Sequence, residues 1–182
     1  ATFALATGIV VTGAMHEDGL GDCADGFWGG WHPAMRLKIM KDSQIGSYGV
    51  WALLVTMGLL FGVIWEMLRW DTWVLPLIAI HVASRAVMPA VMTMLPHARD
   101  TGLSKSVGRV NAISAQIAAS IGAVALGMGF GLFGLALVLV AIITTLVCVR
   151  LARAKIGGQT GAVCGASQQI CEVALLLAVL AG

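Results

Sequence analysis

Long apolar stretches alternate with short polar loops along most of this chain. Forty consecutive residues at 110–149 carry no charge, which corresponds to roughly 60 Å of α-helix, or two crossings of a bilayer core about 30 Å thick. The glycine-rich run at 127–131 predicts the turn between these two helices. The remaining apolar runs predict three further spans, at residues 48–68, 73–95 and 164–180.

This pattern predicts an all-α, polytopic integral membrane helical bundle, with about five full spans in a single transmembrane domain over residues 1–182. Residues 1–15 are apolar but short for a crossing, so we interpret them as the end of a truncated first span whose N-terminal part is missing. They lack the basic region that begins a signal peptide. Hydrophobic residues make up 59% of the chain, charged residues 11%, and the mean hydropathy is +0.92, which excludes an ordinary soluble domain.

The basic residues are distributed unevenly between the two sides that these spans create. By the positive-inside rule the richer side is cytoplasmic, so we expect a multi-pass protein of a bacterial inner membrane whose active site faces the cytoplasm. The net charge of +2 gives no argument for a nucleic acid partner. A homo-oligomer is among the alternatives that the sequence leaves open. The richer side holds nine of the eleven basic residues, namely Arg36, Lys38, Lys41, Arg99, Lys105, Arg109, Arg150, Arg153 and Lys155.

An acidic segment at residues 16–25 reads HEDGLGDCAD and contains four of the nine acidic residues of the chain. On a helix, Asp18, Asp22 and Asp25 would follow i, i+4, i+7 spacing and lie along one face. Their repulsion is relieved either by raised pKa values or by a cation that prefers oxygen ligands, for which Mg²⁺ is the strongest candidate. The second alternative implies phosphate chemistry. The plainer alternative is a solvated acidic loop between two helices.

Two charged residues fall inside the predicted spans. An unpaired arginine at the position of Arg85 costs about 2.5 to 3.5 kcal/mol, so we expect it to have a partner. Glu172 is the only acidic residue of the last span. Two interpretations of Arg85 remain open at this point. It either forms a structural pair with Glu172 or binds a phosphate group of the substrate. His16, beside the acidic segment, could orient a carboxylate, carry a proton or simply pack.

The glycine-rich sequence at 157–161 precedes the last predicted helix. Backbone N–H groups at a helix N-terminus bind anionic oxygens, although such a sequence is also typical of a tight turn. The four cysteines show no C-x-x-C spacing and indicate neither a zinc site nor a disulfide framework.

Five separated motifs, in order along nearly the whole chain, resemble the cobalamin synthases, also called adenosylcobinamide-GDP ribazoletransferases. The motifs that carry the resemblance are the acidic segment at 16–26, the MKDS sequence at 40–43 with Gly46 and Gly49, Ser84 with Arg85, the HARDTGL sequence at 97–103, and the GGQTG sequence at 157–161 with Gly165, Ala166 and Glu172.

The resemblance implies an enzyme of the last step of cobalamin biosynthesis, in which α-ribazole or its 5′-phosphate attacks adenosylcobinamide-GDP and GMP is released. It implies a Mg²⁺ cofactor, an acidic cytoplasmic segment over residues 16–46, and a glycine-rich loop with the start of the last helix over 157–172. The implied catalytic residues are Asp18, Asp22, Asp25 and Asp42, of which the first three bind the metal; the implied substrate-binding residues are His16, Lys41, Arg85, Arg99, Gln159, Thr160 and Glu172.

One position departs from the family pattern. The carboxyl-terminal motif normally continues Thr-Gly-Asp, whereas this chain has Ala162 after Gly161. An aspartate there would add a carboxylate near the acidic segment, so we expect Ala162 to weaken the activity.

Three other interpretations remain beside the cobalamin synthase hypothesis. Arg85 and Glu172 would form an intramembrane pathway in a transporter, and the glycine-rich helices would pack as a scaffold in a structural protein. The sequence from Asp22 to Gly26 also resembles, loosely, the D-x-x-D-G pattern of the CDP-alcohol phosphotransferases. A transporter is expected to carry its acidic residues near the bilayer midplane, often in two pseudo-symmetric halves of the chain. The acidic residues of this chain are instead concentrated in one predicted cytoplasmic segment, which favours an enzyme.

Overall fold

The computed structural model describes residues 1–182, apart from the side chain of Leu103, and confirms the all-α prediction. No strand occurs in the described part of the chain; one isolated backbone pairing joins His97 to Gln159. The helices are α1 (Thr2–Thr12), α2 (Met15–Gly29), α3 (Pro33–Ile39), α4 (Ser47–Met67), α5 (Val74–Met94), α6 (Leu103–Val107), α7 (Ala112–Phe130), α8 (Phe133–Ile156) and α9 (Gly161–Ala181).

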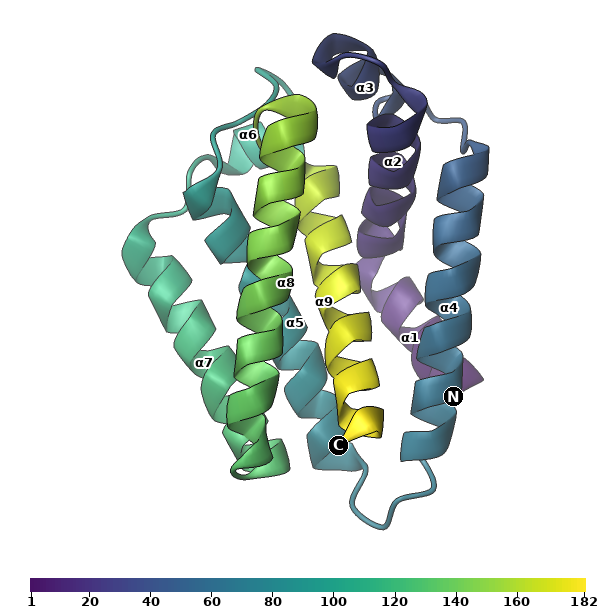
Figure 1. The fold of residues 1–182 in the computed structure, drawn as a ribbon, viewed down its shortest axis with the longest axis vertical. Coiled ribbons are helices and arrows are strands. Elements are labelled where there is room, and N and C mark those ends of the chain that lie inside the picture. The colour runs from purple at the N-terminus through teal and green to yellow at the C-terminus, as the bar shows by residue number, and fades with distance from the viewer.

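Five of these helices, α4, α5, α7, α8 and α9, are long and apolar enough to cross a membrane. They contain 19 to 24 residues and run side by side along the long axis of the molecule (Figure 1). Large apolar side chains such as Leu54, Ile117 and Val124 are exposed on their outer faces, which suits helices that contact lipid rather than water. The five predicted spans are therefore confirmed, whereas α1, with 11 residues, is a shorter apolar helix.

The turn between α7 and α8 lies at the last residue of the glycine-rich run that predicted it. Helix α7 continues to Phe130, and the chain reverses at Gly131, whose φ of +57° favours glycine. The preceding glycine at 129 serves the packing of α7 instead, because a Cβ atom there would lie 2.9 Å from the Cβ of Ala79 on α5. Glycine inside an apolar helix thus allowed a close helix contact and did not end the helix.

Helix α9 lies in the middle of the bundle and is the most buried of the long helices (Figure 1). It packs tightly against α2 because both helices have glycine where they meet. A Cβ atom on Gly19 would lie 2.7 Å from the backbone oxygen of Ala162, and one on Gly165 would lie 3.0 Å from that of Met15. This contact brings the first turns of α9 alongside the acidic segment, which forms the helix that its spacing predicted.

The charged residues inside the bundle are paired. Arg85 Nη1 lies 3.7 Å from Glu172 Oε2, and His81 Nδ1 lies 3.2 Å from Glu172 Oε1. The Glu172 carboxylate also accepts hydrogen bonds from Ser84 and Gln168. The structural Arg85–Glu172 pair considered from the sequence is therefore confirmed, and it joins α5 to α9.

Candidate active site

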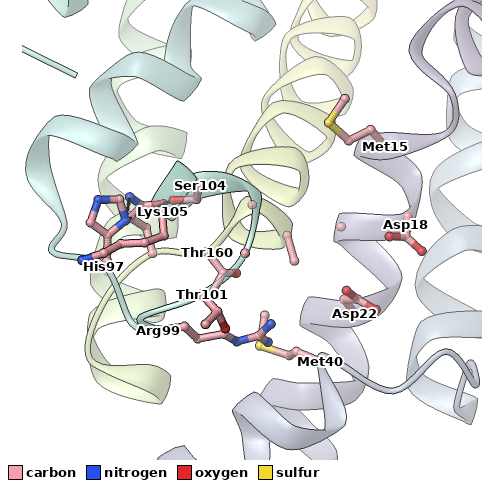
Figure 2. Close-up of a pocket in the computed structure, with 15 residues that line it drawn as sticks. Met15, Asp18, Asp22, Met40, His97, Arg99, Thr101, Ser104, Lys105 and Thr160 are labelled. Atoms are coloured by element: carbon pink, nitrogen blue, oxygen red, sulfur yellow. Dashed lines mark hydrogen bonds between the residues drawn. The ribbon is translucent and has the colours of Figure 1, made fainter. Parts of the chain in front are cut away.

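A polar cavity of about 210 Å³ lies at the end of the bundle that carries α3 and α6 (Figures 1 and 2). Helix α2 forms one wall, and the segment that follows α5 forms the opposite wall. The start of α9 and the loop before it complete the cavity. The lining residues are Met15, Asp18, Gly19, Asp22, Met40, His97, Arg99, Thr101, Gly102, Ser104, Lys105, Gln159, Thr160, Gly161 and Ala162.

The α2 wall carries two carboxylates. Asp18 and Asp22 are one helical turn apart and project from the same face of α2 (Figure 2). Burial, followed by the charge of the neighbouring Asp18 carboxylate, raises the pKa of Asp22 to about 6, although Arg99 acts in the opposite direction. Neither carboxylate accepts a hydrogen bond from the residues that the structure describes, so both keep their lone pairs for a ligand of the cavity.

The opposite wall carries positive charge. The Arg99 guanidinium lies near Met40 and Asp22 (Figure 2), and its Nη2 donates to the backbone oxygen of Leu37 at 3.0 Å. Its Nε is buried and has no hydrogen-bond partner among the described residues. Lys105 lines the same side. A cavity with carboxylates on one wall and cations on the other suits a phosphate group that is bound together with a divalent cation.

A hydrogen-bonded group forms the floor between these walls. The Ser104 hydroxyl donates to Gln159 Oε1, and Gln159 Nε2 lies 3.0 Å from His97 Nδ1. The backbones of the two loops also pair, with Gln159 N donating to Pro96 O at 2.8 Å and Ala98 N donating to Gln159 O at 2.9 Å. These bonds hold the glycine-rich loop against the segment after α5, so two regions about sixty residues apart in sequence build one surface.

Asp25 does not reach this cavity. Its Oδ2 accepts a hydrogen bond from the Gly46 backbone N–H at 2.7 Å, and its Oδ1 accepts one from the Gly49 N–H at 2.9 Å. The carboxylate therefore satisfies free N–H groups at the start of α4. The i, i+4, i+7 spacing predicted three carboxylates around one metal, but the structure brings only Asp18 and Asp22 together in the cavity, because the start of α4 packs on the turn of α2 that carries Asp25.

The other predicted site residues divide between the cavity and its surroundings. Gln159 and Thr160 line it, and the Thr160 hydroxyl also accepts the Val163 N–H at 3.3 Å as the N-cap of α9. Lys41 and Asp42 are exposed in the loop after α3, where Asp42 Oδ1 accepts the Gln44 N–H at 3.2 Å. Neither of these two residues lines the cavity.

His16, Arg85 and Glu172 lie outside the polar cavity as well. His16 lines a neighbouring cavity, and burial, followed by the charge of Arg85, lowers its pKa. Arg85 and Glu172 are engaged with each other inside the bundle. These three residues were predicted to bind substrate, but none of them lines the cavity that holds the aspartates.

Four lining residues with polar side chains were not among the predicted site residues: His97, Thr101, Ser104 and Lys105. The sequence placed this segment on the same side as the acidic residues, but Lys105 was counted only among the basic residues that indicate topology. Nothing in the spacing indicated that Ser104 and His97 would bond to Gln159, because that contact depends on how the two loops pack. Ala162, by contrast, lines the cavity as its position after Gly161 suggested.

A bundle of apolar helices with a charged cavity at one end defines an integral membrane protein of the polytopic helical class, with a site suited to phosphate chemistry. The chain belongs to the cobalamin-5-phosphate synthase family, whose model matches residues 1–180. It is therefore a transferase of cobalamin biosynthesis.

Two relatives show the extent of the similarity. An adenosylcobinamide-GDP ribazoletransferase of Bradyrhizobium diazoefficiens is 44% identical over 185 residues, covering 100% of this chain and 70% of the relative. Its counterpart in Mesorhizobium japonicum is 41% identical over 181 residues, covering 97% of this chain and 68% of the relative. No solved structure matches the fold.

The raised pKa of Asp22 predicts a pH-dependent stability. Because ionised Asp22 is disfavoured in the folded protein, stability is lost as the pH rises from about 4, the value for an unfolded chain, to about 6. In buffer without divalent cations, we expect Asp22→Asn to raise the free energy of unfolding at pH 8 by up to about 2 kcal/mol and to leave it unchanged below pH 4. Thermal unfolding in detergent, at pH 8 and at a pH below 4, measures the change in stability. The control is Glu66→Gln, at an exposed position. Equal midpoints for the Asn variant and the unmodified protein at pH 8 would contradict the assigned shift.

Proposed function

We propose that this transferase joins α-ribazole, or its 5′-phosphate, to adenosylcobinamide-GDP and releases GMP, giving adenosylcobalamin or its 5′-phosphate. The observation that carries the proposal is the polar cavity, with Asp18 and Asp22 on one wall and Arg99 and Lys105 on the other. The names of the relatives support the same substrate. In this reaction a ribose hydroxyl attacks the phosphorus attached to cobinamide, and the bond from this phosphorus to the bridging oxygen breaks, so that GMP departs.

The residues of the cavity fit a Mg²⁺ cofactor. Asp18 and Asp22 offer carboxylate oxygens without protein donors, and their mutual repulsion is part of what raises the pKa of Asp22. No group of three metal-binding side chains occurs in the described part of the chain, so water and phosphate oxygens would supply the other ligands. Mg²⁺ usually keeps several waters and binds through one or two carboxylates plus substrate phosphates. When bound, the ion neutralises charge on the pyrophosphate.

The protein's own groups have separate tasks in this reaction. Arg99 and Lys105 bind phosphate oxygens, where the buried Arg99 Nε–H offers a donor that lacks a protein partner. These cations stabilise the charge that develops on the phosphate oxygens and on the departing GMP. A carboxylate of the Asp18 and Asp22 pair accepts the proton of the attacking hydroxyl. The hydrogen bonds of Gln159 with Ser104 and His97 hold the two loops together, which keeps the cations in position across the cavity from the aspartates.

We also propose that the protein lies in a bacterial inner membrane with this cavity facing the cytoplasm. The basic residues of α3, of the segment after α5 and of the end of α8 surround the cavity end of the bundle (Figure 1). Arg69 lies in the loop between α4 and α5 at the other end. This distribution agrees with the positive-inside rule, and the cytoplasm is where nucleotides are found.

The proposed function predicts that two carboxylates are needed for both metal binding and transfer. In Asp18→Asn combined with Asp22→Asn, we expect the affinity for Mn²⁺ to fall at least tenfold, and GMP release from adenosylcobinamide-GDP and α-ribazole to fall at least about a hundredfold, as for loss of charge stabilisation at a transition state. Calorimetry and a GMP assay on purified protein measure the two effects. Asp71→Asn, in the loop at the opposite end, is the matched control. Unchanged Mn²⁺ affinity together with unchanged GMP release in the double variant would refute the assignment.

The position of Ala162 predicts a gain of activity. Ala162 lines the cavity on the first turn of α9, and its backbone is next to Gly19, beside Asp18. A carboxylate at this position would add an oxygen ligand or orient the attacking hydroxyl, so we expect Ala162→Asp to raise the rate of GMP release at least about tenfold, or roughly 1.4 kcal/mol of barrier. Ala162→Asn, with nearly the same shape and no charge, is the control. An equal rate for the Ala and Asp proteins would show that the cavity already has all the carboxylates it needs.

The orientation predicts which end of the protein an impermeant thiol reagent reaches. Leu132, 88% exposed in the turn between α7 and α8, should react as Leu132→Cys from the periplasmic side of intact cells. Ser43→Cys, in the exposed loop before α4, should react only after the cells are permeabilised. The four native cysteines are buried and serve as an internal background. The reverse labelling pattern would invert the proposed topology.

A further inference from the structure

A second, smaller cavity of about 120 Å³ adjoins the polar cavity beside the first turn of α2. The two cavities share Met15, Ser104 and Gly161 in their linings. Met15 lies beyond Asp18 on α2 as seen from Asp22 (Figure 2). The smaller cavity is mainly apolar, because Met15 together with Met88 and Met92 of α5 forms much of its wall. A ligand that enters it can therefore extend directly into the space between the aspartates and Arg99.

His16 is the polar side chain of this cavity whose ring nitrogens have no hydrogen-bond partner among the described residues. It is 8% exposed, and it makes no hydrogen bond with any residue that the structure describes. The Ser104 hydroxyl, by comparison, is already bonded to Gln159. Buried polar groups are nearly always hydrogen-bonded. Gly165 keeps His16 at this wall, because a Cβ at position 165 would lie 3.1 Å from the His16 Cα and force α2 away from α9.

We propose that this cavity binds the base of α-ribazole, an inference that rests on the function proposed above. Met88 and Met92 lie against the rings of the base, and the His16 N–H donates a hydrogen bond to the free ring nitrogen of the base. The base is a dimethylated benzimidazole, which is a flat apolar bicycle with one unsubstituted nitrogen acceptor. Methionine side chains adapt to aromatic rings and make favourable sulfur contacts with them. The attached ribose then lies where the two cavities meet, close to Asp18.

The other occupants fit this lining less well. Guanine carries donors and acceptors on several edges, and burying them beside three methionines would leave most of them without partners. A lipid acyl chain would fill the apolar space but would leave His16 unpaired. The apolar walls and the single unpaired imidazole match a ring system with a single hydrogen-bonding nitrogen.

The role of His16 is tested with two probes on detergent-purified protein. The first probe is α-ribazole, and the second is its analogue in which the free ring nitrogen is replaced by C–H. We expect the unmodified protein to bind α-ribazole about five- to tenfold more tightly than the analogue, as for one neutral hydrogen bond, and His16→Phe to bind both equally. His16→Gln, which keeps an N–H donor, should restore part of the preference. An undiminished preference in His16→Phe would overturn the assignment of His16.

The position of the base is tested with Met88→Ala. Removing a side chain that packs on the ligand should weaken α-ribazole binding about tenfold, while the Kd for adenosylcobinamide-GDP stays within about twofold. Met94→Ala is the matched control, because Met94 lies on the same helix but lines a different cavity. Calorimetry with each substrate alone gives the two Kd values, and equal thermal midpoints show that the variants are folded.

The outcomes separate this inference from the proposed function. If Met88→Ala leaves the α-ribazole Kd unchanged, or weakens adenosylcobinamide-GDP binding instead, the base does not lie in this cavity, even if the unmodified protein releases GMP as proposed. If the unmodified protein neither binds α-ribazole nor releases GMP with it, the proposed function fails and the subsite fails with it.

Discussion

The close contact of α2 with α9 is the constraint on which the rest of the site depends. Gly19 and Gly165 allow the two backbones to approach closely, because a Cβ atom would lie 2.7 Å from the nearest backbone atom at position 19 and 3.0 Å at position 165. This contact sets Asp18 and Asp22 opposite the segment that carries Arg99, and it sets His16 against the methionines of α5. A wider separation of the helices would move Asp18, Asp22 and His16 away from the residues that line these cavities with them.

The polar residues inside the bundle stabilise this arrangement. Glu17 Oε1 accepts a hydrogen bond from Gln169 Nε2 at 2.9 Å, which fixes α2 on α9, while Glu172 bonds to Arg85 and His81 of α5. Charges in a membrane are costly unless they are paired. Since Arg85 and Glu172 already satisfy each other, their presence has a structural explanation, and an ion pathway through this pair is not needed to account for them.

The sequence predicted the spans well because their signal is local. A helix in a bilayer needs about 20 apolar residues, and the predicted spans lie within a few residues of α4, α5, α7 and α9, whereas α8 continues beyond the predicted stretch to Ile156. The acidic segment was predicted as one helical face, but the spacing could not show that the start of α4 would occupy Asp25. That contact joins residues more than twenty positions apart through tertiary packing.

The binding cavities were the least predictable feature. The Ser104, His97 and Gln159 group depends on the pairing of two loops, and neither loop carries a sequence signal for the other. The motifs that resemble the cobalamin synthases pointed to both loops, yet they did not distinguish residues that line the cavity from those, such as Asp42, that only flank it. The structure separates them because it shows which side chains share one space.

In the function that we propose, a divalent cation held by Asp18 and Asp22 shares the polar cavity with the pyrophosphate of the nucleotide substrate. Phosphorus NMR of adenosylcobinamide-GDP bound to the purified protein, titrated with paramagnetic Mn²⁺, tests it directly. We expect both phosphorus resonances to broaden at Mn²⁺ concentrations that saturate the protein, and we expect Asp18→Asn with Asp22→Asn to abolish this protein-dependent broadening. Broadening that is the same with the double variant as with the unmodified protein would contradict it.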